Sequence, residues 1–285
     1  MIIEPLFDPR TWTLTYVVWD RATRDAVVID PVLDYDPLAV RVFDESNDKV
    51  LAIVRKNDLK VHLVLDTHAH ADHLSGFQKL KDELGAAIGI GAQVTRVQAA
   101  FKGLFGLDPA FPTDGSQWDV LATDGVPLQA GSLSIVPIHT PGHTPACVTY
   151  RIGDALFTGD ALFVPDSGTG RCDFPGGSAE ALYDSLQKLY AFPDETRVFV
   201  GHDYQPGGRA LQYQTTIGAS KQNNIQLRGD TTREAFVTFR TARDATLRPP
   251  NLIFQSLQVN VNAGVLPEAA PNGIRYLRLP MNILK

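Results

Sequence analysis

Short apolar runs bounded by polar turns recur along the chain, and runs of this length predict buried β-strands. The first two, 13–19 and 26–29, are rich in β-branched and aromatic residues, which favour strands. Further strands are predicted by apolar runs at 61–65, 86–91, 133–138, 148–152, 155–157 and 197–200. No element is predicted over 32–45, which has no clear period, or over the loop-like stretch 101–125. The aromatic side chains of that stretch are expected to pack: Phe101, Phe105, Phe111 and Trp118.

Apolar residues three and four positions apart predict helices between the strands. Ser46 is a suitable N-cap for a helix that ends near Asn57. A helix over 74–84 is expected to end at Gly85, since glycine commonly follows a helix. Two later helices, the second expected to be the last before a Pro- and Asn-rich extension, lie at 178–190 and 232–246. This order of elements favours an α/β sandwich whose loops meet over one edge.

Composition narrows the class of protein. The chain has 285 residues, of which 44% are hydrophobic and 20% charged, as in an ordinary globular protein. The net charge of −6 argues against nucleic acid as the main partner, because phosphate binding needs a basic surface. No apolar run approaches 18 residues and no secretory signal is visible, so we expect neither a membrane span nor export. With only Cys147 and Cys172, both expected to be free thiols, we expect a reducing cytoplasm.

The stretch 67–76, T-H-A-H-A-D-H-L-S-G, follows one predicted strand and contains three of the seven histidines. Residues two apart in an extended chain point the same way, so His68 and His70 can converge on one point. Asp72 and His73 come after the chain has turned, so their side chains can bind a metal at a neighbouring position. Imidazole and carboxylate suit Zn, Fe or Mn better than Mg or Ca. The stretch therefore predicts a transition-metal site.

Three more ligand candidates each follow an apolar run: His143 in T-P-G-H-T, Asp160 in F-T-G-D and His202 in V-G-H-D-Y. Any one of them alone is more often structural. Together with the first cluster they make seven groups, enough for two adjacent metal positions with Asp160 between them. Asp30, at the end of the strand over 26–29, is either a turn former or an acceptor beneath the metal loop. Two histidines without such a context are interpreted as structural: His62 and His139.

These motifs occur in the order found in the metallo-β-lactamase superfamily, which the chain resembles over at least residues 13–204. The resemblance implies an αββα sandwich with the metal site at its edge. It also implies a catalytic domain over 1–210, with a short C-terminal helix and extension over 211–285 packed on the same domain. Because this fold supports many reactions, the surroundings of the site must decide the function.

Two further stretches are similar to the persulfide dioxygenases, especially the bacterial branch often labelled β-lactamase-like hydrolase. They are G-T-G-R-C-D-F-P-G-G at 168–177, and R-D-A-T-L-R-P-P-N-L at 243–252 followed by Q-V-N-V-N-A-G at 258–264. Glyoxalase II shares the metal motifs and a loop similar to 168–177, which we call the arginine loop after Arg171. It normally carries a larger helical C-terminal domain, which is not visible in this sequence.

In persulfide dioxygenases one Fe(II) is held by residues that correspond to His68, His143 and Asp160, which leaves three positions open. The resemblance implies that the other motif residues orient ligands and substrate: His70, Asp72, His73 and His202. All seven residues of a two-metal site are nevertheless present, so a binuclear zinc hydrolase of the glyoxalase II type stays an alternative. A non-catalytic sensor is disfavoured because every ligand position is filled.

The implied reaction converts glutathione persulfide, O₂ and water to glutathione and sulfite. Because glutathione has two carboxylates, Arg171 is expected to bind substrate, the alternative being a surface salt bridge. Tyr204 is expected either to donate its hydroxyl to substrate or to pack. Cys172 replaces the Thr of the related G-T-G-R-T-D-F loop and is either a small filler or a modifiable thiol. We expect a cytoplasmic homodimer without nucleic-acid or membrane partners.

Overall fold

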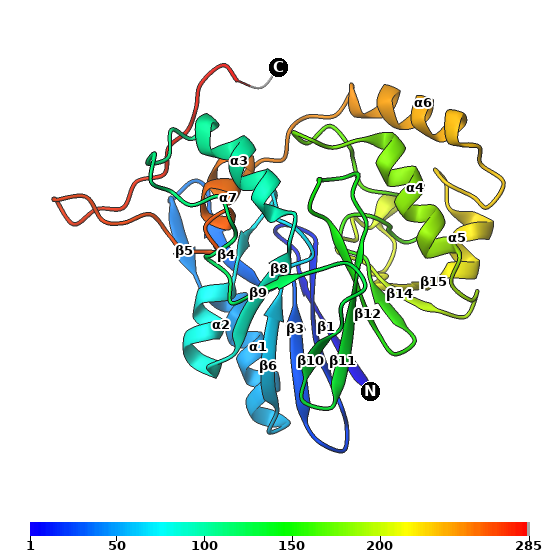
Figure 1. Ribbon diagram of the computed structural model, residues 1–285, viewed down its shortest axis with the longest axis horizontal. Coiled ribbons are helices and arrows are strands. Elements are labelled where there is room, and N and C mark those ends of the chain that lie inside the picture. The colour runs from blue at the N-terminus through cyan, green and yellow to red at the C-terminus, as the bar shows by residue number, and fades with distance from the viewer. Residues whose placement is uncertain (284–285) are drawn as a thin grey trace.

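The computed structural model describes residues 1–283 and contains two six-stranded sheets that face each other (Figure 1). The first sheet runs in the order β1 (Ile2–Asp8), β2 (Thr13–Trp19), β3 (Asp25–Ile29), β6 (Lys60–Leu65), β8 (Ala87–Gly91) and β9 (Val120–Ala122). The second runs in the order β10 (Leu128–Ala130), β11 (Leu133–His139), β12 (Val148–Ile152), β13 (Ala155–Phe157), β14 (Arg197–Phe199) and β15 (Gln214–Thr216). A small third sheet has the order β5 (Arg41–Phe43), β4 (Val32–Asp36) and β7 (Leu74–Ser75).

Helices cover the outer faces of both large sheets (Figure 1). On the first sheet lie α1 (Glu45–Lys56), α2 (Phe77–Leu84), α3 (Val94–Leu104) and α7 (Ile253–Asn260). On the second lie α4 (Ala179–Tyr190), α5 (Ile217–Asn223) and α6 (Arg233–Asp244), with the short 3₁₀ helix η1 (Pro206–Gly208) before β15. The predicted αββα sandwich is therefore confirmed.

Strand β2 is buried on both faces, which explains why apolar residues occur at adjacent positions in it. All seven of its residues are buried. Leu14, Tyr16 and Val18 pack between the sheets, whereas Val17 and Trp19 pack beneath the helices, because successive side chains point to opposite faces. The Tyr16 hydroxyl donates to the main-chain oxygen of Val200 at 2.7 Å, which ties the first sheet to the end of β14 in the second.

The interpretation of residues 32–45 as featureless was wrong, since β4 and β5 form a hairpin there. The N-cap position of the helix that follows is Asp44, not Ser46 as predicted, and the Asp44 side chain makes no capping hydrogen bond. Ser46 lies in the first turn of α1, where its amide and hydroxyl donate to the buried Asp34 carboxylate at 2.7 and 3.0 Å. The Ser46 hydroxyl, which suggested an N-cap, therefore bonds the Asp34 carboxylate instead.

Other boundaries also differ from prediction. Leu74 and Ser75 pair with β4 as β7, so the following helix starts at Phe77, although it ends at Gly85 with φ +62° as expected. Residues 101–104 belong to α3. The helix predicted at 232–246 is present as α6 but is not the last, because α7 forms within the extension that was expected to be irregular. The aromatic residues of 101–125 pack against the first sheet as predicted: Phe101, Phe105, Phe111 and Trp118.

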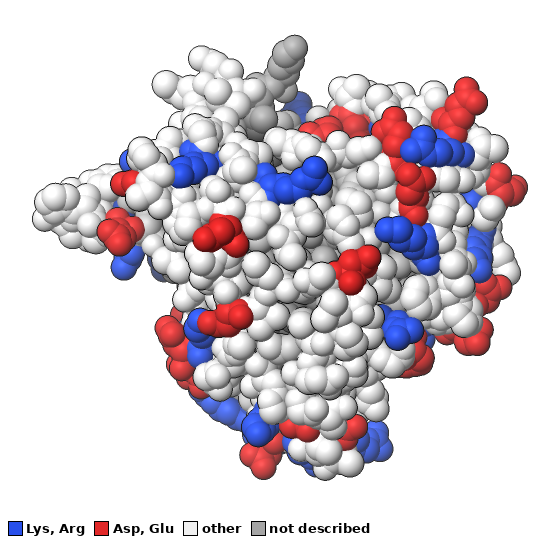
Figure 2. All heavy atoms as spheres, viewed as in Figure 1, with Lys and Arg blue, Asp and Glu red and all other residues white. Residues whose placement is uncertain are grey.

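The C-terminal residues contribute to the second sheet and to the helices on both outer faces. β15 pairs with β14, α6 packs on α4, and α7 contacts β7. On the face shown in Figure 2, charges of both signs are interspersed without a continuous basic surface. Within residues 1–283, no helix has the length and apolar character that crossing a bilayer requires.

Candidate metal centre

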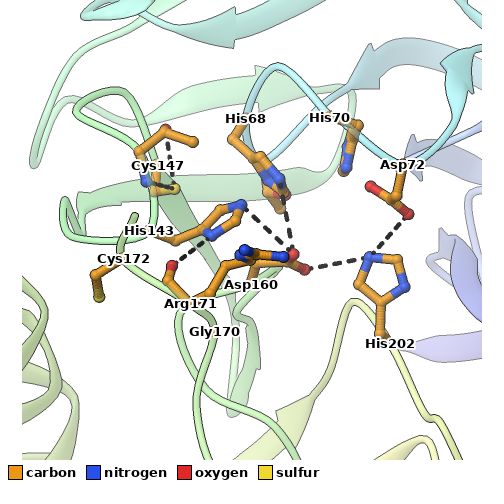
Figure 3. A network of polar contacts seen from close by, with 12 residues as sticks. His68, His70, Asp72, His143, Cys147, Asp160, Gly170, Arg171, Cys172 and His202 are labelled. Atoms are coloured by element: carbon orange, nitrogen blue, oxygen red, sulfur yellow. Dashed lines mark hydrogen bonds and ion pairs between the residues drawn. The ribbon is translucent and has the colours of Figure 1, made fainter. Parts of the chain in front are cut away.

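The predicted ligand residues follow four strands whose ends meet at one edge of the sandwich. The loop after β6 carries His68 to His73, and His143 lies in the turn between β11 and β12. Asp160 follows β13 and His202 follows β14. Figure 3 shows the Asp160 carboxylate between the imidazoles of His68 and His143 on one side and that of His202 on the other.

Glycines allow these loops to approach closely. Gly159, directly before Asp160, has φ +47°, and a Cβ added to it would overlap the side chain of Thr67. Gly170 has no room for a side chain either, because a Cβ would overlap the main-chain oxygen of Asp160. The glycines of T-G-D and G-T-G-R therefore bring the Asp160 turn against the loop after β6 and the arginine loop.

Two imidazoles and one carboxylate form a tight cluster. The Oδ2 atom of Asp160 lies 3.6 Å from Nε2 of His143 and 4.0 Å from Nε2 of His68. One ligand atom from each of the three residues lies within 4.8 Å of the others, and all three residues are buried. The two rings are 4.9 Å apart and nearly perpendicular, at 88°. The structure thus brings together the three residues expected to hold the metal.

Hydrogen bonds to the second ring nitrogen prepare these imidazoles for a metal. His143 Nδ1 donates to the main-chain oxygen of Arg171 at 2.7 Å. His68 Nδ1 lies 3.1 Å from Thr67 Oγ1, which donates to Asp30 Oδ2 at 3.0 Å. Each Nε2 is then left with a lone pair, and that of the buried His68 has no hydrogen-bond partner among residues 1–283. A transition metal fits this donor set, since metal-bound histidines almost always bond protein through the other nitrogen.

The protonation states agree with this fit. Burial, with the neighbouring imidazoles, lowers the pKa of His68 well below its ordinary value. Burial also lowers the pKa of His73 to about 4. Both side chains are therefore neutral at pH 7, the form in which imidazole binds a metal.

The remaining motif residues lie on the other side of Asp160. His202 Nε2 is 3.3 Å from Oδ1 of Asp160 and 3.4 Å from Oδ2 of Asp72, while its Nδ1 donates to the main-chain oxygen of Trp12 at 3.2 Å. One ligand atom each from His70, Asp72 and His73 forms a second group within 4.8 Å. Asp160 thus separates two groups of side chains, as a bridging residue would.

Asp30 is an acceptor beneath the loop, which is one of its two predicted roles. Its Oδ1 accepts from the Thr67 amide at 2.7 Å and from His70 Nε2 at 3.0 Å. Burial opposes a charge on His70, but the carboxylates of Asp30, Asp66 and Asp72 together outweigh it and raise the pKa of His70 to about 10. Asp30 therefore fixes both the backbone and one side chain of the loop.

A cavity of about 1020 Å³ adjoins the cluster and is lined by Asp72, His143 and Asp160 among others. Arg171 lies on its wall, as predicted for a substrate contact, but its guanidinium pairs with Asp173 at 2.5 and 2.6 Å. It also donates to the main-chain oxygen of Arg248 at 2.7 Å. These bonds use three of its five N–H groups and leave two for a ligand.

Tyr204 also lines the cavity, with its ring stacked on His202 at 5.6 Å and half of its surface exposed. Cys172 is buried, and burial raises the pKa of its thiol well above the ordinary value. Figure 3 shows its sulfur turned away from Asp160. A buried, protonated thiol is inert, which supports the interpretation of Cys172 as a small filler.

The two histidines interpreted as structural bond elsewhere: His62 Nε2 lies 2.6 Å from Asp25, and His139 Nε2 lies 3.0 Å from the main-chain oxygen of Pro145. Sequence analysis did not identify the functional importance of the other arginines of the cavity wall. It also did not identify a buried side-chain amide that holds the loop after β6. The amide lies in the Q-V-N-V-N-A-G stretch and Arg243 begins the R-D-A-T-L-R-P-P-N-L stretch, whereas the other arginines have no distinctive spacing. These residues are Arg10, Arg41, Arg240 and Arg243 on the wall, and Asn260 behind the loop.

Comparison with known proteins agrees with this geometry. Residues 12–202 match the family model of the metallo-beta-lactamase superfamily. The chain belongs to this superfamily. It is thus a metal-binding enzyme, with the αββα fold found above.

This superfamily member is 47% identical over its whole length to a probable metallo-hydrolase from Burkholderia pseudomallei, which it also covers completely. It is 48% identical over 99% of its length to the beta-lactamase hydrolase-like protein of Xylella fastidiosa strain Temecula1, but spans only 65% of that protein.

The other similarities are to persulfide dioxygenases. Human mitochondrial persulfide dioxygenase ETHE1 is 32% identical, over 72% of this chain and 69% of that protein. The crystal structure of ETHE1 from Myxococcus xanthus is 34% identical, with a TM-score of 0.74 over 93% of this chain and 100% of that one. The similarity to this branch, inferred from the loop motifs, is confirmed.

Proposed function

We propose that the protein is an Fe(II)-dependent persulfide dioxygenase with one iron per chain. The observation that carries the proposal is the compact cluster of His68, His143 and Asp160 beside a large cavity. Two histidines and one carboxylate on one face are typical of non-haem Fe(II) oxygenases, where they leave positions open for substrate and O₂. The similarity to the ETHE1 proteins, over most of the chain, supports the same choice.

The proposed reaction takes glutathione persulfide, O₂ and water to glutathione and sulfite. One O₂ and one water supply the three oxygens of sulfite, and the carrier sulfur leaves as the thiol. When bound, the ferrous ion would supply the oxidation chemistry, and the protein orients the reactants and limits side reactions.

The residues around the cluster keep the carboxylate in place. A proton on His202 Nε2 would bond Asp160 Oδ1 at 3.3 Å and so direct Oδ2 toward His68 and His143. Asp72, 3.4 Å from the same nitrogen, would hold that imidazole from the other side. His70 and His73 maintain the loop in which Asp72 lies.

The cavity wall suits an anionic tripeptide. Arg171 has two N–H groups left for a substrate carboxylate. Arg41 and Arg243 also line the cavity, and neither has a carboxylate within 4.0 Å among residues 1–283. The half-exposed Tyr204 lies on the same wall. We propose these groups as contacts of glutathione, because guanidinium binds carboxylate with two parallel hydrogen bonds.

One observation favours a second candidate, a binuclear zinc hydrolase of the glyoxalase II type. His202 faces Asp160 across from the first cluster, and His70, Asp72 and His73 form another group of suitable ligands. A pair of zinc ions there would activate water for attack on a thioester, a lactone or a related substrate. The names of the relatives from B. pseudomallei and X. fastidiosa, a probable metallo-hydrolase and a hydrolase-like protein, fit such a hydrolase.

Metal content and substrate together separate the two candidates. The full chain would be purified without oxygen, loaded with Fe(II), and assayed with glutathione persulfide in an oxygen electrode, with sulfite measured at the end. We expect about one iron per chain and one sulfite per O₂, with no hydrolysis of lactoylglutathione. Two zinc ions per chain with thioester hydrolysis, and no O₂ uptake, would replace the dioxygenase by the hydrolase.

The expected location and assembly also stay proposals. Cys147 and Cys172 are both buried free thiols, which supports a cytoplasmic protein. We retain the homodimer as a proposal based on family resemblance.

A further inference from the structure

A single buried amide from the C-terminal part of the chain holds the loop after β6. Asn260 is the last residue of α7 and is only 2% exposed. Its Nδ2 donates to the main-chain oxygens of His70 and His73, both at 2.8 Å. Its Oδ1 accepts from the main-chain amide of Ser75, also at 2.8 Å. All three bonds join residues at least 185 positions apart in sequence.

These bonds determine the shape of the bend. The loop between β6 and β7 has no helix or strand of its own, so its carbonyl groups lack regular main-chain partners. The oxygens of His70 and His73 both turn toward one amide, which closes the bend around Asp72. Buried carbonyl groups need such partners, and here one side chain satisfies two of them.

The turn after α7 is fitted closely to the same loop. Gln78 Nε2, in α2, donates to the main-chain oxygen of Ala263 at 2.7 Å. Gly264 has φ +76°, and a Cβ added there would lie 3.0 Å from the main-chain oxygen of Ser75. The turn directly after Asn260 is thus held against α2 and β7.

We propose that Asn260 is a positioning residue for the metal centre, acting through the backbone at His70, His73 and Ser75. By fixing this bend it sets where Asp72 and His73 stand relative to His68 and Asp160. The C-terminal helix α7 is then required for full metal affinity. The inference does not depend on the proposed reaction. With two zincs the bend would carry ligands directly, whereas with one iron it would act through Asp72, which faces His202 and through it Asp160.

The test measures Co²⁺ binding to the metal-free full chain by absorption titration, without turnover. Asn260→Asp keeps the side-chain shape and the acceptor for Ser75, but it replaces the donating Nδ2 by one acceptor oxygen that faces the carbonyls of both His70 and His73. We expect Co²⁺ affinity to fall about 10- to 100-fold, the usual effect of removing a partner behind the ligands. A changed Co²⁺ absorption spectrum would report altered ligand geometry, which a general loss of stability does not produce.

Gln258→Ala is the matched control. Gln258 lies in the same helix and also makes three hydrogen bonds, but to Phe254 and Arg278 instead of the metal loop. We expect its Co²⁺ affinity and spectrum to stay as in the wild type, even if its thermal stability falls.

Equal losses of affinity in both variants would overturn the proposal, as would an unchanged affinity in Asn260→Asp. If Asn260→Asp does not fold, Gln78→Ala loosens the same turn by removing one bond, and weaker Co²⁺ binding is again expected. Unchanged binding in a folded Gln78→Ala protein would then count against the role of the turn.

Discussion

The Nδ1 atom of His143 donates to the main-chain oxygen of Arg171 at 2.7 Å, so the arginine loop holds a proposed metal ligand through its backbone. The guanidinium of the same residue lines the cavity and pairs with Asp173. One residue therefore serves two purposes with two different groups. Replacing the side chain leaves the bond to His143 in place, which makes the substrate contact separately testable.

We predict that Arg171→Ala raises KM for glutathione persulfide by about tenfold or more with a much smaller change in kcat. A hydrogen bond to a charged group contributes about 1.5–3 kcal/mol, and 1.4 kcal/mol corresponds to tenfold. Oxygen uptake against substrate concentration gives both constants. Arg197→Ala is the control, because Arg197 forms a similar two-bond pair with Asp154 but does not line the cavity. A lower kcat at unchanged KM would contradict the assigned role.

Substitution of the cluster itself should remove the metal. In Asp160→Ala and in His143→Ala, only two of the three proposed ligands remain, and the buried groups around them lose their counter-charge or partner. We predict less than stoichiometric iron after reconstitution and loss of O₂ uptake in both variants. The control is His62→Ala, since His62 bonds Asp25 instead of the cluster. Elemental analysis checks the first outcome, and normal iron content with normal turnover in Asp160→Ala would refute the ligand set.

The sequence was informative about elements that are buried on both faces or that end at a distinctive residue. β2 was predicted with its full range because it is rich in β-branched and aromatic residues, and α2 ends at Gly85, as predicted, because glycine adopts the left-handed conformation. β4 and β5 were missed because they are short and alternate irregularly. α7 was missed because the Pro-rich segment before it resembles a loop and its periodicity is weak.

The residues of the site likewise fall into those that could be predicted from the sequence and those that could not. Histidines and aspartates at strand ends form local motifs, so the cluster of His68, His143 and Asp160 was anticipated. Asn260 and Arg243 lie in stretches singled out by resemblance, but their roles were not anticipated, since each reaches the site only because α7 and α6 pack where they do. When the role of a residue depends on tertiary contact with a distant segment, the spacing of residues along the chain does not reveal that role.

Asp30→Asn tests the support beneath the loop. The Asp30 carboxylate accepts from the Thr67 amide and hydroxyl and from His70 Nε2, and an asparagine offers only one acceptor atom to these donors. Hydrogen bonds to a buried charged group contribute about 1.5–3 kcal/mol, so we predict a loss of about that size. Thermal unfolding would record a lower Tm, whereas Asp20→Asn, in an exposed turn, should change it little. An unchanged Tm in Asp30→Asn would show that these bonds do not stabilise the fold.

Asp25 gives a prediction for acid conditions. Its carboxylate lies 2.6 Å from His62 Nε2 and accepts from the Ser132 amide at 2.9 Å, which links β3 to the turn before β11. The hydrogen bond with His62, followed by that from Ser132, lowers the pKa of Asp25 far below its ordinary value. A carboxyl whose pKa is lower in the folded state stabilises the protein above its unfolded pKa, about 3.9. That contribution is lost as the pH falls through the lower folded pKa.

We therefore predict that Asp25→Asn destabilises the protein at pH 7, and that its difference from the wild type shrinks as the pH drops below about 4. Urea unfolding between pH 3 and 7 measures this difference. Metal-free forms of both proteins are compared, because histidine ligands release a metal in acid. The titration of Asp25 would not be linked to folding if the difference between the two proteins were constant across this range.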